Sequence, residues 1–214
     1  MRGVVAHVGH RLRFKRDVQG RIPSTTHRLS GEVEVPDVVD LIMSDHREVE
    51  RLLTLVKDHP DQRPLQLPVL SALLIAHSRA EEAEVYPVAR IEADEADEVA
   101  LSQEEHLEAE RLLEQLHGLD PMSKRFDSVL DKLIAAVKEH IEHEESVVLP
   151  ELRQGVDKAR REELGEIFAT ARETHLGELP GQATRAELVA QARNVGVPGA
   201  SSMTRSQLQQ TLRV

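Results

Sequence analysis

Two stretches of the chain, HSRAEEAEVYP at 77–87 and HIEHEESVVLP at 140–150, share one pattern: His, three residues, Glu-Glu, four residues, Pro. Aligned without gaps, they agree at five of eleven positions. A second pair, DHREVERLLTLV at 45–56 and EHLEAERLLEQL at 105–116, precedes the two copies and agrees at six of twelve positions. The chain therefore contains His … His-x3-Glu twice, which is typical of a metal site.

The composition restricts how a metal could be held. The 214 residues include no Cys, so disulfides, thiolate metal sites and cysteine nucleophiles are excluded, and any metal must bind His and carboxylates. The absence of Cys also agrees with a reducing cytoplasm, the location we expect. No run of eighteen apolar residues occurs, so no membrane span is predicted. Aromatic residues make up only 2%, which leaves Leu, Val and Ala to fill a helical core.

Charge is unevenly distributed along the chain. The formal net charge is −11, but residues 1–30 carry +6 and residues 184–214 carry +3, so the middle, 31–183, carries the remaining −20. An acidic body repels nucleic acid phosphate, whereas the two basic ends could attract it.

Apolar residues recur at helical spacing from Pro36 onward. The first helix starts at Asp37 and stops at His59-Pro60, and a proline-punctuated loop through Pro68 follows. Further helices are expected up to Pro87, over 97–117, from Asp120-Pro121 to about 153, and over 157–175. The predicted fold is all-α: an up-down-up-down four-helix bundle with an extra helix and a small C-terminal helix-turn-helix-like module.

The predicted domain map has four parts. They are a basic, disordered N-terminal extension at 1–35, the bundle at 36–175, a linker at 176–183 and the small helical module at 184–214.

Residues four apart lie on one face of a helix, so His77 projects with Glu81, and His140 with Glu144. Antiparallel packing can bring His46 and His106 of the other two helices to the same level. Four imidazoles and two carboxylates are too many for one tetrahedral zinc ion and suit two octahedral ions. Iron or manganese is favoured over soft-ligand metals, although zinc or copper could bind adventitiously. The alternative is a metal-free bundle with hydrogen-bonded core histidines.

Four other carboxylates occupy related positions in the two halves. Glu50 and Glu110 lie on the ligand faces of their helices, where each could bind metal, orient a histidine or form a surface ion pair. Glu82 and Glu145 lie about 100° round the helix from the predicted ligands, which favours a supporting or solvated role over ligation.

Two further residues are additional candidates. His143 is one turn from His140 and has Ala80 as its counterpart in the other copy, so it could add an imidazole or lie exposed. Tyr86, the one Tyr of the chain, is expected to pack at the end of the second helix, with ligation or a radical role as the alternatives.

The two HxxxEE-x4-P copies with their paired histidines resemble the hemerythrin-like HHE cation-binding domains over about residues 37–153. The resemblance implies a four-helix bundle with a non-haem, oxo- or hydroxo-bridged di-iron centre that meets O2, hydrogen peroxide or NO, with manganese or zinc as alternative metals. Carried over residue by residue, it implies as metal ligands His46, His77, Glu81, His106, His140 and Glu144.

The sequence departs from the oxygen-carrying hemerythrins, which have His-x3-His on the third helix and an Asp at the end of the last ligand run. Here these places hold His106-x3-Glu110 and Glu144. A set richer in carboxylates favours the ferric state, which argues against a reversible O2 carrier. We therefore expect a protein that binds or consumes a small oxidant. Catalase-like turnover is one version, with no catalytic residue beyond the metal site, and sensing or iron holding is another.

The C-terminal segment holds two near-copies, TRAEL at 184–188 and TRSQL at 204–208, each opening a short amphipathic helix. It loosely resembles the small helical modules of the Rho N-terminal and SAP types, which contact nucleic acid. The alternative function is thus an iron- or oxygen-responsive regulator whose basic module contacts nucleic acid or a protein partner. A bundle-capping role is also open, and the sequence does not indicate an oligomeric state.

Overall fold

The first helix of the bundle begins where the sequence provides a cap. The computed structural model describes residues 36–213, and the prediction for residues 1–35 lies outside them. Helix α1 spans Val38–Asp58, and the Asp37 side chain accepts a hydrogen bond from the Val39 backbone N–H at 3.0 Å. The helix ends before His59, as expected, because Pro60 cannot continue the hydrogen-bonding pattern.

Helix α2 begins earlier than the sequence suggested. A short 3-10 turn at Pro60–Gln62 leads directly into α2, Arg63–Ala80, so the predicted loop through Pro68 is wrong. Pro64 lies in the first turn, where a backbone N–H has no helical partner and is not missed. Pro68 lies inside the helix, where the neighbouring Leu67 and Leu70 are buried. Tertiary packing offsets the hydrogen bond that Pro68 removes.

The second and fourth long helices both widen directly after the His-x3-Glu pattern. Helix α2 passes into a π-helical segment, Glu81–Val85, and then into α3, Tyr86–Glu92. Helix α5, Lys124–His143, passes into a second π-helical segment, Glu144–Val148, and then into α6, Leu149–Gly155. A proline follows each widened turn at the second position of α3 and α6. Because proline cannot donate to the carbonyl four residues back, the wider turn lets the chain continue.

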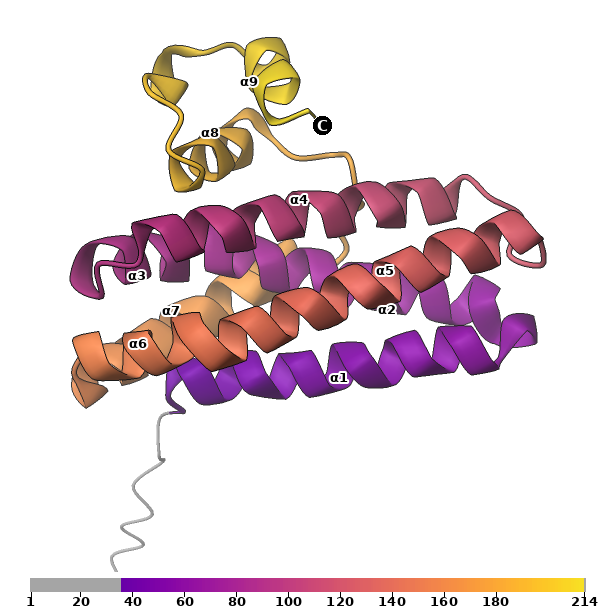
Figure 1. Cartoon of the computed structure of the whole chain (residues 1–214), viewed down its shortest axis with the longest axis horizontal. Helices are drawn as coiled ribbons and strands as arrows, with labels where there is room; N and C mark the ends of the chain where they lie inside the picture. The colour runs from indigo at the N-terminus through magenta and orange to yellow at the C-terminus, as the bar shows by residue number, and fades with distance from the viewer. Residues whose placement is uncertain (1–35, 214) are drawn as a thin grey trace, which may run out of the picture. The chain divides into compact units, whose positions relative to one another are not determined.

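The bundle consists of α1, α2, α4 (Ala96–His117) and α5, and the chain reverses direction at each connection (Figure 1). Helix α7, Lys158–His175, packs against α1 and α2. Within residues 36–213 every regular element is a helix, which confirms the all-α prediction. None of these helices is long and apolar enough to cross a membrane.

Two apolar clusters fill the bundle, with a polar layer between them. One cluster contains Val49 and Leu52 of α1 together with Phe126 of α5. The other contains Ile42 of α1 and Phe168 of α7. His46 lies between Ile42 and Val49 along α1, so the layer of histidines separates the two clusters.

Two short helices, α8 (Arg185–Asn194) and α9 (Arg205–Leu212), form the C-terminal module, which we define as residues 184–213. Thr184 with Glu187 and Thr204 with Gln207 each make a complete capping box, which explains the near-copies TRAEL and TRSQL. The module's apolar core includes Leu107 of α4. Helix α8 therefore lies against the bundle, above α4 in Figure 1.

Candidate metal centre

Four histidines, one from each long helix, meet in the polar layer: His46 of α1, His77 of α2, His106 of α4 and His140 of α5. All four are at most 5% exposed. The ring centroids of His46 and His77 are 5.1 Å apart, and those of His106 and His140 are 4.5 Å apart. The structure thus brings together the four histidines that the repeat predicts.

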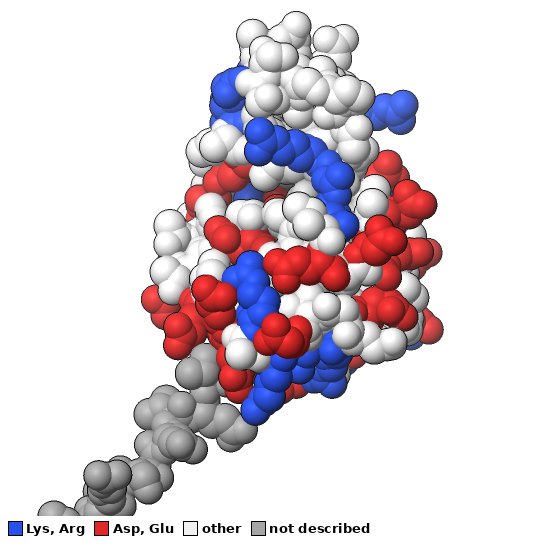
Figure 2. Space-filling model, turned by 90° about the vertical axis from the view of Figure 1, so that its left-hand side faces the viewer, with Lys and Arg blue, Asp and Glu red and all other residues white. Residues whose placement is uncertain are grey.

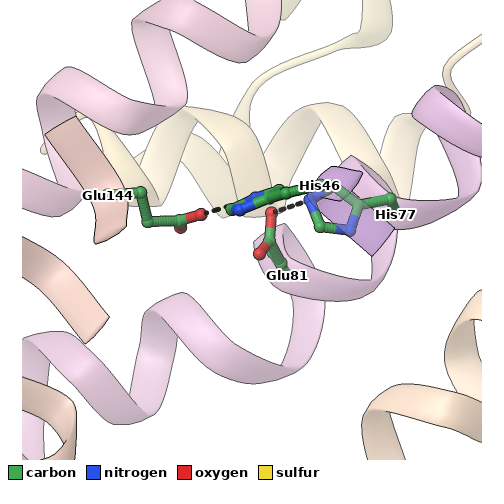
Figure 3. Close-up of side chains that lie close together, drawn as sticks. All are labelled: His46, His77, Glu81 and Glu144. Carbon is green, nitrogen blue, oxygen red and sulfur yellow. Dashed lines mark ion pairs between the residues drawn. The ribbon is translucent and has the colours of Figure 1, made fainter. Parts of the chain in front are cut away.

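Glu81 and Glu144 lie between these rings, at the first residue of each π-helical segment. Glu81 Oε2 is 3.1 Å from His77 Nε2 and 3.4 Å from His106 Nε2. Glu144 Oε2 is 3.2 Å from His46 Nε2 and 3.7 Å from His140 Nε2. Each carboxylate therefore contacts one histidine from its own half of the chain and one from the other half. Figure 3 shows the contacts of His46 with Glu144 and of His77 with Glu81.

The donor atoms fall into two overlapping groups. His46, His77, Glu81 and Glu144 offer atoms within 4.8 Å of one another, and so do Glu81, His106 and His140. Several of these atoms have no hydrogen-bond partner among the described residues, including both oxygens of Glu81 and the Nε2 atoms of His46 and His77. A buried polar atom without a partner costs about 1–3 kcal/mol. Such a convergence fits bound cations, which would use the unpaired atoms as ligands.

Each histidine turns its outer nitrogen, Nδ1, toward a second carboxylate. For His46, His77 and His140 the contact is a hydrogen bond, which fixes the ring orientation and raises the basicity of the inward nitrogen, while His106 Nδ1 lies at ion-pair distance from its carboxylate. The Nδ1-to-oxygen distances are 2.8 Å for His46 with Glu145, 3.4 Å for His77 with Asp45, 3.5 Å for His106 with Glu82, and 3.0 Å for His140 with Glu105.

These four outer carboxylates follow the internal repeat. Glu82 and Glu145 occupy equivalent positions in the two copies. They lie beside His106 and His46 and not among the ligands, which agrees with the supporting role favoured by their spacing. Asp45 and Glu105 directly precede His46 and His106 and are also equivalent, and sequence reasoning missed them. Both copies have an acidic residue directly before the histidine, and this feature could have predicted the pair. Because one residue is Asp and the other Glu, the position does not count as identical in the alignment.

The electrostatics of the centre follow from burial and these close pairs. Burial works to lower the pKa of His77, but Glu81 and Asp45 raise it to about 10. Burial likewise works to lower the pKa of His106, and Glu81 and Glu82 raise it to about 9. Burial works to raise the pKa of Glu81, but His77 and His106 hold it well below its usual value. Protons on the rings of His77 and His106 therefore balance the negative charge of Glu81, and a bound cation would replace these protons.

Tyr86 lies at the edge of the centre, where it belongs to α3. Its hydroxyl oxygen is 3.2 Å from His106 Nε2 and donates to Glu144 Oε1 at 3.4 Å. Burial, followed by the charge of Glu144 and then Glu81, raises the pKa of Tyr86 well above 10. The hydroxyl therefore keeps its proton and remains a hydrogen-bond donor.

Three other candidates are placed outside both ligand groups. Glu50 is partly exposed and pairs with a neighbouring arginine of α1. Glu110 accepts two hydrogen bonds from Arg79 at 2.8 Å each. His143 is half-buried and lies 2.8 Å from Glu98. Because each has another partner and forms no side-chain hydrogen bond or ion pair with the six predicted ligands, we leave all three out of the ligand set.

Comparison with known proteins gives two findings. Residues 37–152 match the family model of the hemerythrin HHE cation binding domain. A curated protein described as a DNA nickase, from Nostoc sp. (strain PCC 7120 / SAG 25.82 / UTEX 2576), is 30% identical over 152 residues, which cover 70% of this chain and 43% of the relative. The chain therefore matches less than half the length of that relative. No solved structure matches the chain.

Proposed function

The chain belongs to the hemerythrin HHE cation-binding domain family, and on that premise we propose that it is a non-haem di-iron protein that binds or consumes a small oxidant: O2, hydrogen peroxide or NO. The observation that carries the proposal is the pair of ligand groups that overlap at Glu81. A carboxylate shared between two groups is suited to bridging two cations. A cytoplasmic location is part of the proposal, because the chain has no Cys.

In the proposed ligand set, His46 and His77 would hold one cation, and His106 and His140 would hold the other. Glu81, which belongs to both ligand groups, would be shared between them, and Glu144, which contacts His46 and His140, would be the second shared carboxylate. Imidazole with carboxylate favours iron or manganese, and the family resemblance favours iron. When bound, two iron ions would supply electrons to a small oxidant, and in catalase-like turnover a second peroxide molecule would return them.

The surrounding residues restrict what can reach this centre and hold its protons. Every proposed ligand is at most 5% exposed, so only a molecule of a few atoms fits without a large rearrangement. The Tyr86 hydroxyl is directed at the atoms between His106 and Glu144, where it can donate a hydrogen bond to a ligand. This donor and the excluded water support binding or turnover of O2, peroxide or NO.

The number of histidines in the centre, one fewer than in an oxygen carrier, supports consumption of the oxidant over its reversible binding. Glu110 stands where an oxygen carrier has a histidine, and it is turned toward Arg79 and the Gly181 N–H rather than toward the centre. The proposed set therefore has four imidazoles and two shared carboxylates, with no fifth histidine. Catalase-like peroxide consumption is the version of the proposal that we would test first.

The test combines metal analysis with a peroxide assay. Protein purified natively should contain iron and consume hydrogen peroxide, and His77→Ala should lose both properties. His143→Ala is the matched control, because this histidine lies one turn from His140 yet pairs with Glu98. It should retain metal and activity. Stoichiometric zinc as the sole bound metal would contradict the di-iron proposal.

A second candidate function is contact with DNA or RNA, favoured by the name of the Nostoc relative and by the charge of the C-terminal module. The module carries four arginines against one glutamate. Figure 2 shows acidic side chains spread over the bundle with some basic ones among them, while on the module the charged side chains in view are basic. Arg193 and Arg213 are both exposed.

Reversing the charges of Arg193 and Arg213 should weaken nucleic acid binding and reduce the dependence of its affinity on salt. Binding that ignores salt, or no binding at all, would remove this candidate, and a supercoiled plasmid reports nicking in the same samples.

A further inference from the structure

Glu82 is the carboxylate with the most hydrogen-bond partners at the edge of the metal centre. It is 2% exposed, and its Oε1 lies 3.5 Å from His106 Nδ1. Oε1 also accepts a hydrogen bond from Gln103 Nε2 at 2.7 Å. Oε2 accepts from Arg79 Nη1 and from Gln191 Nε2, both at 3.0 Å. The last of these donors comes from α8 of the C-terminal module, so the module reaches the centre through one intervening side chain.

A second amide of α8 strengthens this connection. Asn194 Nδ2 donates to the Glu82 backbone carbonyl at 3.0 Å and to Gln103 Oε1 at 2.9 Å. Gln191 and Asn194 are both buried, at 0% and 3% exposed. In this docking the side-chain N–H groups of both amides are paired, although Gln191 Oε1 has no partner among the described residues, and an alternative docking of α8 would leave these donors unpaired too. The contacts therefore specify one position for α8 on the bundle.

The other half of the centre has no such cover. Glu145, the repeat counterpart of Glu82, lies closer to its histidine: its Oε1 is hydrogen-bonded to His46 Nδ1 at 2.8 Å, and its side chain is 20% exposed. Its arginine partner is Arg47, which is 53% exposed, whereas Arg79, the arginine partner of Glu82, is buried. Glu82 is thus held by Arg79, Gln103 and α8 in the interior, while Glu145 is partly exposed and has no contact with α8. This difference makes the module's contribution measurable within one chain.

We infer that α8 is a structural support of the metal centre, in which Gln191 and Asn194 position His106 by holding Glu82, so that cation binding and module docking stabilise each other. The inference rests on the proposed function, because it requires a cation at His106. Coupling between two sites is reciprocal. A cation that fixes the position of His106 therefore also fixes Glu82 and stabilises its hydrogen bonds to α8. Conversely, loss of these hydrogen bonds lowers the affinity for the cation.

The test uses the full chain and Fe²⁺ added without oxygen. Hydrogen exchange followed by mass spectrometry should show that Fe²⁺ slows exchange in α8, on the order of tenfold. The double variant Gln191→Leu/Asn194→Leu should bind one of its two iron ions about tenfold more weakly, the lower end of what the loss of a ligand-orienting contact costs. In this variant Fe²⁺ should no longer protect α8.

Two control variants separate this coupling from general damage. Arg47→Leu removes the arginine partner of Glu145 and should weaken iron binding without changing hydrogen exchange in α8. Gln210→Leu alters an exposed residue of the module and should change neither. If the double variant unfolds the module and still binds iron as tightly as the native chain, the inference is wrong. Iron binding by the native chain with no protection of α8 overturns it too, while absence of iron binding overturns the proposed function itself.

Discussion

Replacing Arg79 with Met removes the positive charge that holds two buried carboxylates. Arg79 is 2% exposed, and its Nη2 lies 2.8 Å from both oxygens of Glu110. Its Nη1 donates to Glu82 at 3.0 Å. Met has a similar length but no charge, so Arg79→Met leaves both carboxylates buried without their main counter-charge.

The size of the effect can be worked out in two ways. Breaking a buried ion pair by removing one partner costs about 3–5 kcal/mol. Burial works to raise the pKa of Glu82, but Arg79 and then His106 lower it from 4.5 to about 2. That difference corresponds to about 3 kcal/mol of stability at neutral pH. The second value also contains the contributions of His106 and Gln103, so it supports only the order of magnitude, and we expect Arg79→Met to lose about 3–5 kcal/mol.

The pH dependence of this loss has a defined sign. Because the pKa of Glu82 is lower in the folded chain than in the unfolded chain, its contribution is present above pH 4.5 and is lost as the pH falls toward 2. In Arg79→Met burial dominates, so the pKa of Glu82 rises and the unpaired carboxylate takes up a proton on mild acidification. The stability gap between native protein and variant should therefore narrow between pH 7 and pH 5.

The assay is thermal and urea unfolding of metal-free protein at both pH values. The expected loss corresponds to a fall of roughly 6–20 °C in Tm for a domain of this size. Arg47→Met is the matched control, since Arg47 is itself 53% exposed, and it should cost less than about 1 kcal/mol. Equal losses in the two variants, or a gap that does not change with pH, would refute the reasoning.

Three further predictions concern the metal centre and helix α7. Glu81→Ala should lose both metal ions, because Glu81 belongs to both ligand groups, and metal analysis that still finds one tightly bound ion would contradict this. Tyr86→Phe should keep its metal, lose about 1 kcal/mol in urea unfolding and consume peroxide more slowly; unchanged turnover would exclude a role for the hydroxyl. Phe168→Ala should cost about 3–5 kcal/mol in the same assay, because the ring is fully buried with its centroid 6.0 Å from that of His77, and a loss below 1 kcal/mol would show that α7 is not a structural cover.

The sequence predicted the helices and the six central side chains because both depend on local spacing. A proline followed by Asp37 marks the start of α1, and a His-x3-Glu pair lies on one face of any helix. The internal repeat then relates the two halves without knowledge of the fold. The sequence did not predict the π-helical segments, since a proline one turn further along indicates a break but not the way the chain continues.

The contacts that could not be predicted are those between distant segments. Gln191 and Asn194 look like ordinary surface amides of a short helix, and no spacing rule places them near Glu82, more than 100 residues earlier. By its spacing, Glu110 lies on the same helix face as His106, but its carboxylate pairs with Arg79 and does not point to the centre. Both outcomes depend on which helices pack together, and periodicity carries no information about that choice.

The most direct test of the central claim is the quantity of iron per chain in protein purified from the organism that makes it. We predict two iron ions per chain, together with an oxo-to-iron absorption band in the near ultraviolet that disappears in Glu81→Ala. A chain that carries only zinc, or that retains its iron when Glu81 is removed, would contradict it.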